Sequence, residues 1–461
     1  MISPSADVPA AGRKRALEVI LGVVLLAILA GYVFASQLRF LDNDEYEHLH
    51  KAWMMTQGTI PYFSATALHM PLLEWVIAGI MKCTGESALI LRVMRLVMVG
   101  IMLASLVQIH AITSRLFGSV LQARLALLLL CSNFIWMQKA IEIRPDNIMV
   151  LFVLLSFRVL MRWYRAPKVR DALWFLVLAG LAVLGKQNAL VFYAVVGVLF
   201  FVDAWRRGWI GWRTLTAMFC VLLCLGVWPS FRAFLDATLW HLARNPDRFS
   251  PFVKFGKAWA FNRTLFILFL FQVFAPLRLL PEYEGLRKHI RLIPWVACAM
   301  LFVINRPFLQ EGLVMAVFMS IVASDLVARA VSASNSLLAL AISAFIAAPA
   351  LVSAPDYALK KTWTREYEST REILRISEPT DLVFDSYGRA IFRHHPLEPQ
   401  FLNYHPRRFY RLDDLQRSGV KYLMLDQIYT PRLPKPVLQW MSDNFEPTGV
   451  HPDIYVRKSG G

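Results

Sequence analysis

Long apolar segments, separated by short polar ones, make up the first three quarters of the chain. A membrane-spanning helix needs roughly 20 such residues to cross a hydrocarbon core of about 30 Å, and fewer where it is tilted or sheltered. The pattern predicts about eleven such helices. They are expected over residues 17–36, 88–112, 120–137, 147–163, 171–185, 188–204, 214–231, 259–277, 290–305, 311–328 and 335–354. The apolar segment 71–83 is too short to cross and predicts a re-entrant or interfacial helix.

The chain after Pro355 has a different pattern, in which short hydrophobic runs alternate with polar segments. Residues 381–385, 421–426 and 453–456 predict short buried strands, and residues 364–376 predict an amphipathic helix that begins near Thr364. About 100 residues can bury a modest core of their own. The expected fold is therefore an α-helical polytopic membrane domain over residues 1–354, followed by a small α/β domain over residues 355–461.

Composition supports an integral membrane protein and excludes several other classes. The chain is 57% hydrophobic and 18% charged, whereas soluble globular proteins carry about 25% charged residues. A cytosolic enzyme, a disordered chain and a collagen-like chain are excluded on this ground. All five cysteines lie in or beside apolar runs and none lies in the polar tail, so no disulfide framework is expected.

The distribution of charge predicts the orientation in the membrane. The formal net charge is +17, yet residues 355–461 hold 16 basic against 14 acidic residues and so contribute only +2 of it. The excess belongs to the loops between helices, which favours membrane topology over nucleic-acid binding. Basic clusters at 13–15, 162–170, 206–213 and 278–291 fall on one side when the predicted helices are threaded in order. That side is the cytoplasm, so the N-terminus is expected there and the C-terminal domain on the outer face.

The start of the chain resembles a signal peptide, because basic residues precede an apolar run and Val33-Phe34-Ala35. The apolar run is longer than a usual signal sequence. A retained first helix is therefore expected, with the outer loop 37–87 following it.

This outer loop begins with the densest group of titratable side chains in the sequence. Four carboxylates and two imidazoles lie within nine residues: Asp42, Asp44, Glu45, Glu47, His48 and His50. Such a group suits general-base catalysis or metal binding, and a solvated polar loop is the alternative. The loop then returns to the membrane at His69 and the short apolar segment 71–83. A loop that returns in this way builds a cavity, which favours the functional interpretation.

A series of short motifs continues from this loop over roughly residues 40 to 190. They are the acidic pair Asp44-Glu45, Gly58-x-x-Pro61-Tyr62, His69 before Pro71-Leu72, an arginine at Arg92 or Arg95, Arg144-Pro145-Asp146 and Gly185-Lys186-Gln187. In this order, and with an outer C-terminal domain, the chain resembles the polytopic C-superfamily (GT-C) glycosyltransferases. The resemblance is to the branch that includes protein O-mannosyltransferases and the bacterial aminoarabinose transferase.

The resemblance implies a transferase that uses a polyprenyl-phosphate-linked sugar at the periplasmic face of a bacterial inner membrane. It places the catalytic carboxylate on Asp44 or adjacent Glu45, with Asp44 favoured because the acid most often stands first in the pair. A second acid falls on Asp146. Basic residues near the donor phosphate fall on His69, Lys186, Arg144, His241 and Arg248.

The implied chemistry suits these residue types. A carboxylate can take the proton of an acceptor hydroxyl as it attacks the anomeric carbon, and cations can stabilise the departing phosphate. Single displacement would invert the anomeric configuration, although two carboxylates also fit double displacement.

Each of these residues also has a structural alternative. Asp146 begins a helix, where the helix dipole favours a carboxylate in any protein. Lys186 can turn a tight helical hairpin, and His69 can be an interfacial histidine without a ligand. Arg92 and Arg95 can extend to lipid headgroups.

No cofactor is required by the expected reaction, and a divalent metal is the alternative. Its weak candidate ligands are Glu47, His48 and His50. The expected partners are the lipid-linked donor, membrane lipids and a lipid, glycan or protein acceptor, with no nucleic acid and an open oligomeric state. Alternative functions are a transporter or flippase for a lipid-linked glycan, an oligosaccharide ligase or polymerase, and a non-catalytic scaffold. A transporter typically has paired repeats and charged or broken helices near the bilayer midplane, and the sequence shows neither.

Overall fold

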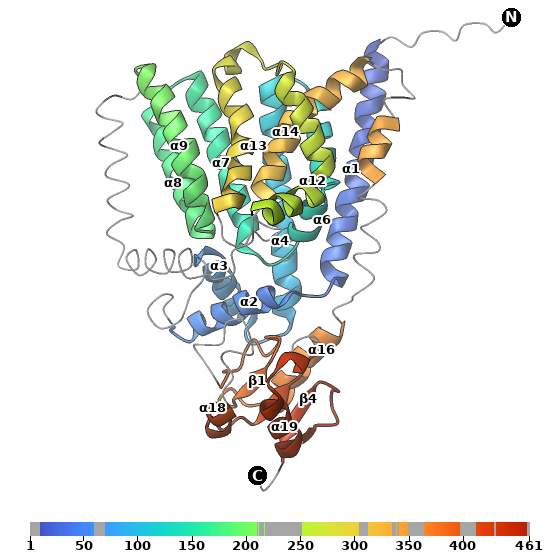
Figure 1. Ribbon diagram of the computed structural model, residues 1–461, viewed down its shortest axis with the longest axis vertical. Helices are drawn as coiled ribbons and strands as arrows, with labels where there is room; N and C mark the ends of the chain where they lie inside the picture. Colours follow the sequence, from blue (N-terminus) through green and yellow to red (C-terminus); the bar gives the residue numbers. More distant parts are fainter. Residues whose placement is uncertain are drawn as a thin grey trace, which may run out of the picture.

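The computed structural model describes residues 10–59, 70–209, 211, 216, 251–303, 312–333, 338, 341–348, 364–396, 412–427 and 430–458. Long helices run side by side through most of the molecule, and a small sheet with short helices lies at the end opposite the N-terminus (Figure 1). The helices of the large part are α1 (Ala10–Leu38), α4 (Leu89–Phe117), α5 (Val120–Cys131), α6 (Phe134–Lys139), α7 (Pro145–Arg165), α8 (Val169–Gly185), α9 (Asn188–Arg206), α12 (Pro251–Phe274), α13 (Arg287–Val303) and α14 (Leu313–Ala333), with the 3-10 helix η1 (Pro281–Leu286) before α13.

Five helices of the described residues are long and apolar enough to cross a membrane. They are Arg15–Leu38, Leu89–Phe117, Pro145–Arg165, Asn188–Arg206 and Leu313–Ala333. The predicted helical, multi-pass architecture is thus confirmed. The predicted span 214–231 lies outside the described residues except for residue 216, and only residues 338 and 341–348 of the span 335–354 are described. The number of eleven therefore stays a prediction.

The predicted continuous helix over residues 120–137 is wrong, because the chain breaks it at Ser132-Asn133. Helix α5 ends at Cys131, and the Asn133 side chain accepts hydrogen bonds from the backbone N–H groups of Ile135 (3.0 Å) and Trp136 (3.3 Å). Asparagine at this position starts a new helix by satisfying its unpaired N–H groups. The short helix α6 that results ends at Lys139, whose Nζ lies 3.8 Å from Asp42 Oδ2, at the end of the helices that faces the small sheet.

Two short helices, α2 (Asn43–Thr56) and α3 (Leu72–Thr84), follow α1 at this end (Figure 1). Helix α3 agrees with the predicted short apolar helix over 71–83. Its buried side pairs with α2 and α4 in one cluster that includes Tyr46, Leu73 and Ile77. Trp75 on its other side is 42% exposed. An apolar side chain left exposed beside a buried face is typical of a helix that lies in the membrane interface.

The C-terminal part contains a four-stranded sheet in the order β1-β2-β4-β3. Its elements are α16 (Thr364–Ile376), β1 (Val383–Asp385), α18 (Leu412–Arg417), β2 (Tyr422–Met424), η3 (Thr430–Arg432), α19 (Lys435–Asn444), β3 (Phe445–Pro447) and β4 (Ile454–Arg457). Strands β1 and β2 are parallel, with Phe384 opposite Leu423, and the other pairs are antiparallel. The predicted helix and three strands are present. Strand β3 was not predicted, and it holds Pro447 because it is an edge strand, where proline is tolerated.

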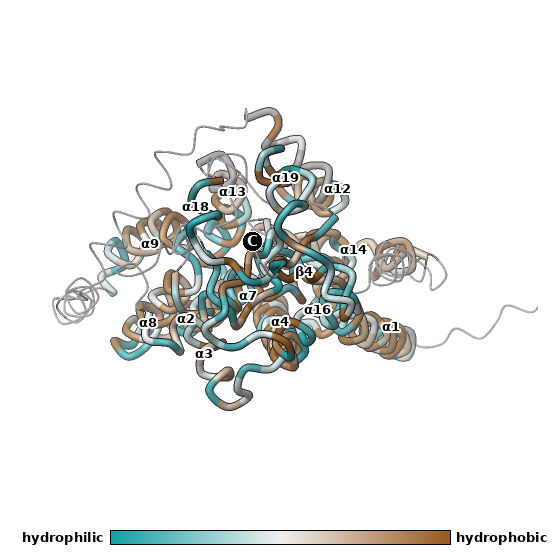
Figure 2. Tube along the Cα trace, turned by 90° about the horizontal axis from the view of Figure 1, so that it is seen from below, coloured by the Kyte–Doolittle hydropathy of each residue, from teal (hydrophilic) through white to brown (hydrophobic). Residues whose placement is uncertain are grey.

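The C-terminal part packs directly on α2 and α3. Tyr387, Ile391 and Phe392 belong to the same buried cluster as Tyr46 and Leu73. Seen from this end of the molecule, α18 carries hydrophilic residues whereas α1 and α9 carry mostly hydrophobic ones (Figure 2). The independence of residues 355–461 as a domain, and its outer location, remain predictions.

Candidate functional site

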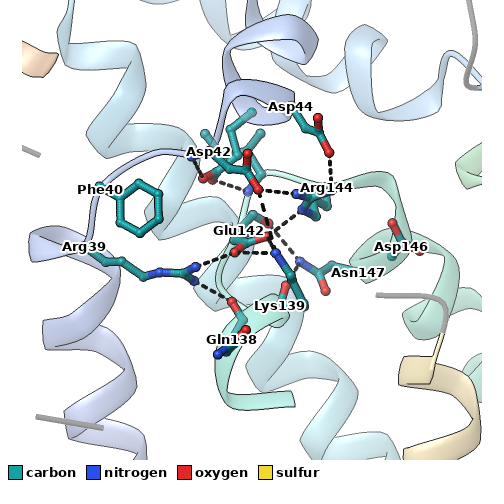
Figure 3. A network of polar contacts seen from close by, with 12 residues as sticks. Arg39, Phe40, Asp42, Asp44, Gln138, Lys139, Glu142, Arg144, Asp146 and Asn147 are labelled. Atoms are coloured by element: carbon teal, nitrogen blue, oxygen red, sulfur yellow. Dashed lines mark hydrogen bonds and ion pairs between the residues drawn. The ribbon is translucent and has the colours of Figure 1, made fainter. Parts of the chain in front are cut away.

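A fully buried carboxylate, Glu142, is the centre of a network of ion pairs at the end of the helices that faces the small sheet (Figure 3). It accepts hydrogen bonds from Lys139 Nζ (2.8 and 2.9 Å) and Arg144 Nε, and lies 2.7 Å from Arg39 Nη2. Burial raises the pKa of the Glu142 carboxyl, but Arg144, Lys139 and Arg39 outweigh it and hold the pKa well below its ordinary value. Glu142 is therefore an ionised anchor for three cations.

Arg144 connects this anchor to the start of α2. It stands at the N-cap of α7 with an extended backbone. Its Nη1 donates to Asp44 Oδ2 (2.7 Å) and its Nη2 to Asp42 Oδ2 (2.6 Å). The guanidinium group thus spans three carboxylates with its forked donors, an arrangement that lysine does not provide. Arg144 was predicted to contact donor phosphate; each of its three guanidinium nitrogens donates to a carboxylate, and the phosphate contact stays a prediction.

Asp44 is the most accessible carboxylate of the network. Its side chain is 40% exposed, whereas that of Glu142 is 0% exposed. Burial raises the pKa of the Asp44 carboxyl, but the charge and hydrogen bond of Arg144, with smaller contributions from His48 and Lys139, lower it overall. An ionised, accessible carboxylate whose orientation is fixed by a buried arginine suits a general base.

Glu45 lies beside Asp44 in the sequence but has the opposite environment. It is fully buried, and it accepts hydrogen bonds from Arg95 Nη2 (2.6 Å), Ile143 N (2.6 Å) and Asp42 N (2.9 Å). Its pKa is raised, chiefly by burial. In this structure the two oxygens of Glu45 hold three segments of the chain together, and its role as a second candidate base stays a prediction.

The interpretation of Arg95 as a lipid-facing side chain is wrong, whereas Arg92 is exposed and the same interpretation stays a prediction for it. Arg95 is 2% exposed and forms the ion pair with Glu45. The Arg92 guanidinium carbon lies 5.0 Å from the centre of the Tyr367 ring in the C-terminal part.

The structure brings together Asp146 and Lys186, which were predicted separately. Lys186 Nζ donates to Asp146 Oδ1 at 2.6 Å, and both residues are buried. Gly185 makes this approach feasible, because a Cβ there would lie 3.2 Å from the backbone nitrogen of Met149 on α7. The Gly-Lys-Gln turn thus places α8 against the start of α7. Asp146 is ion-paired inside the protein rather than open to a substrate.

The weak metal candidates do not converge. Glu47 pairs with Lys51, His48 Nδ1 lies 2.7 Å from Glu74 Oε1, and His50 Nδ1 lies 2.8 Å from the Ile391 carbonyl oxygen. In the part of the chain that the structure describes, no three His, Cys, Asp or Glu side chains are grouped as a metal site. A divalent metal on these residues stays a prediction.

Three predicted phosphate contacts, His69, His241 and Arg248, lie outside the described residues. Conversely, Arg39, Lys139 and Glu142 are central to the network and were not predicted. The segment Lys139-Ala-Ile-Glu142-Ile-Arg144 carries a signal for two of them. Charges of opposite sign within an apolar run are costly to bury unless they are paired, and their close spacing predicts such pairing.

Comparison with known proteins agrees with this architecture. Residues 68–231 match the family model described as dolichyl-phosphate-mannose-protein mannosyltransferase. No curated protein matches the chain in sequence. The crystal structure of ArnT from Cupriavidus metallidurans bound to undecaprenyl phosphate is similar, with a TM-score of 0.56 at 15% identity, covering 82% of this chain and 84% of that chain.

The oligosaccharyltransferase of Archaeoglobus fulgidus is also similar in fold. Its apo form has a TM-score of 0.53 at 12% identity, covering 87% of this chain and 69% of that chain. Its complex with Zn and sulfate gives 0.52 at 12% identity, with 87% and 67% covered. The fold shared with these proteins, together with the family match over residues 68–231, confirms the resemblance of this chain to the C-superfamily glycosyltransferases.

Proposed function

We propose that the protein is a membrane glycosyltransferase that moves a sugar from a polyprenyl-phosphate-linked donor to an acceptor on the periplasmic face of a bacterial inner membrane. The observation that carries the proposal is the accessible Asp44 carboxylate, held by Arg144 above the buried Glu142 network. The fold shared with ArnT, whose crystal structure contains undecaprenyl phosphate, supports the class of donor.

In the proposed reaction Asp44 is the general base. Its carboxylate takes the proton of the acceptor hydroxyl as that oxygen attacks the anomeric carbon, and the bond between sugar and phosphate breaks. The polyprenyl phosphate leaves with the bonding electron pair, and the configuration at the anomeric carbon inverts. Glu45 and Glu142 keep the loop and Arg144 in place, and no resident metal takes part.

The donor phosphate needs cations that carboxylates have not already neutralised. Among the residues that the structure describes, three cations of the network form ion pairs with three carboxylates. The cations are Arg39, Lys139 and Arg144, and the carboxylates are Asp42, Asp44 and Glu142. Lys186 is likewise paired with Asp146. The phosphate contacts are therefore assigned in this proposal to His69, His241 and Arg248, as the family resemblance implies.

The orientation in the proposal follows from charge and from the position of the helices. The N-terminal end of α1 lies at the far end of the molecule from α2, α3 and the C-terminal part (Figure 1). The basic clusters around residues 162–170 and 278–291 favour a cytoplasmic location for the loops that contain them. The Asp44 site and the C-terminal part are accordingly assigned to the periplasm.

The proposal is tested with detergent-purified protein, undecaprenyl-phosphate-linked mannose, glucose and aminoarabinose, and crude membrane lipids as acceptors, with EDTA throughout. Wild-type protein is expected to release undecaprenyl phosphate and to label a new product. Asp44→Asn is expected to lower this rate by about 10²- to 10⁴-fold, the usual contribution of a positioned base.

The matched control is Asp42→Asn, which removes the other carboxylate bound to Arg144. It is expected to retain a rate at least about tenfold above that of Asp44→Asn, because it leaves the proposed base in place. Equal rates for wild type and Asp44→Asn would contradict the assignment of the base. Donor binding without turnover for any sugar would favour the transporter alternative.

A further inference from the structure

A buried asparagine at the start of α7 holds the segment that carries Glu142. Asn147 is 5% exposed and stands in the first turn of the helix, one residue after Asp146. Its Nδ2 donates to the backbone carbonyl oxygens of Lys139 (3.0 Å) and Glu142 (2.9 Å). Figure 3 shows Asn147 beside these two residues within the polar network. One side-chain amide thus closes residues 139–147 into a loop.

These contacts require an amide at this position. Both partners of Nδ2 are carbonyl oxygens, which only accept hydrogen bonds, and the side-chain amide of asparagine supplies two N–H donors. An ionised aspartate of the same shape supplies none. The segment also holds the buried apolar side chains of Ala140, Ile141 and Ile143. Carbonyl groups buried in such surroundings need donors from the protein, and Asn147 supplies one to each of the two.

The segment closed by Asn147 reaches the proposed base by two routes. Through one route, Arg144 Nη1 donates to Asp44 Oδ2 (2.7 Å). Through the other, the backbone N–H of Ile143 donates to Oε1 of Glu45 (2.6 Å), the residue next to the base. A shift of the segment would therefore move both the arginine that orients Asp44 and the backbone donor that holds its neighbour.

We propose that Asn147 is a positioning residue for Asp44, which it holds through residues 139–144. The role rests on the proposed function, in which Asp44 takes the proton of the acceptor hydroxyl. Asn147 touches neither the donor nor the acceptor in this mechanism. Its loss leaves the base present but lets Arg144 and Ile143 shift, and a misplacement of about 1 Å in a reacting group can lower a rate by about 10²-fold.

The test measures kcat and the KM for the donor, with whichever undecaprenyl-phosphate-linked sugar of the panel is active with wild type. Asn147→Ala removes both donors and should lower kcat by about tenfold. Asn147→Asp keeps the shape but places a carboxylate beside two carbonyl oxygens, so kcat should fall at least as far. The KM for the donor should stay unchanged in both variants, because the proposed phosphate contacts lie on other residues. A wild-type kcat in folded Asn147→Ala would overturn the positioning role.

Asn444 provides a matched control. Its Nδ2 also donates to a backbone carbonyl oxygen, that of Trp440 at 2.9 Å, at the end of α19 in the C-terminal part. Asn444→Ala removes the same type of contact outside the site and is expected to keep the wild-type kcat. Thermal unfolding of both variants separates a loss of folded protein from a loss of rate per folded molecule. An equal fall of kcat in both variants would indicate general destabilisation and overturn the positioning role.

A double-mutant cycle with Arg144→Lys tests whether Asn147 acts through the contacts of its segment. Lysine keeps the charge but does not reproduce the forked contacts of arginine. Because both changes disturb the same support of Asp44, kcat of the double variant should fall by less than the product of the two single losses. A fall equal to that product would mean that the two residues act independently, and would overturn the positioning role alone. Absence of transfer by wild type would overturn the proposed function, and the positioning role with it.

Discussion

At the scale of single residues, the site depends on pairing between charges that are distant in the sequence. Asp44 and Arg144 could be predicted as candidate site residues from their motifs, but their contact between distant segments of the chain could not. Glu45 illustrates the limit. Sequence shows two adjacent acids, and only the fold shows that one is accessible while the other is fully buried against Arg95 and Ile143.

Glu142→Gln tests the anchoring role at this scale. It leaves Arg39, Lys139 and Arg144 close together without their central charge, and breaking a buried ion pair costs about 3–5 kcal/mol. The free energy of unfolding, measured by detergent titration, is expected to fall by about that amount. Asp381→Asn, which removes a partner of the half-exposed Lys421, should change it by less than about 1 kcal/mol. Equal losses in both variants would contradict the anchoring role.

At the scale of elements, the hydrophobic pattern predicts a helix well where the burial of one apolar face is the main factor that sets the helix length. Helix α3 and helix α16 begin and end within a residue or two of the predicted positions, because each has one continuous apolar face. The break between α5 and α6 was missed, since two polar residues interrupt an otherwise apolar run. That break matters for the site because α6 ends at Lys139 and so positions its side chain to donate to Glu142.

The cap of α6 provides the corresponding prediction. Asn133→Ala removes the acceptor for two backbone N–H groups, which costs about 1 kcal/mol, and it loosens the helix that positions Lys139. Ser119→Ala removes the equivalent cap at the N-terminal end of α5, away from the break between α5 and α6. Ser119 Oγ accepts a hydrogen bond there from Gln122 N at 3.3 Å. Both variants should lose similar stability in thermal unfolding. Sugar transfer is expected to fall severalfold in Asn133→Ala only, and a similar fall in both would point to general destabilisation instead.

At the scale of the whole molecule, the C-terminal part holds the helix that carries Asp44. Tyr387 Oη donates to the Leu41 carbonyl oxygen (2.8 Å), just before α2 begins. Glu86, just before α4, accepts from both Trp53 Nε1 of α2 (2.9 Å) and Arg393 Nη1 (3.0 Å). The sequence predicts the helix and strands of residues 355–461, but it gives no signal that a loop after β1 reaches the first outer loop more than 300 residues earlier.

Arg393→Ala tests this coupling. Arg393 is 4% exposed and, besides Glu86, bonds to Ser377 Oγ (2.8 Å) and to the Ser377 carbonyl oxygen (2.9 Å). Its loss should therefore weaken the contact between the C-terminal part and the start of α4, and with it one of the supports of α2. Hydrogen exchange of the α2 amides is expected to accelerate by about tenfold or more, corresponding to about 1.4 kcal/mol of lost local stability, and the rate of sugar transfer should fall with it. Arg375→Ala, which removes a 60% exposed arginine from α16, is the control and should change neither. Unchanged transfer and unchanged exchange in α2 on loss of Arg393 would mean that the Arg393 contacts do not position Asp44.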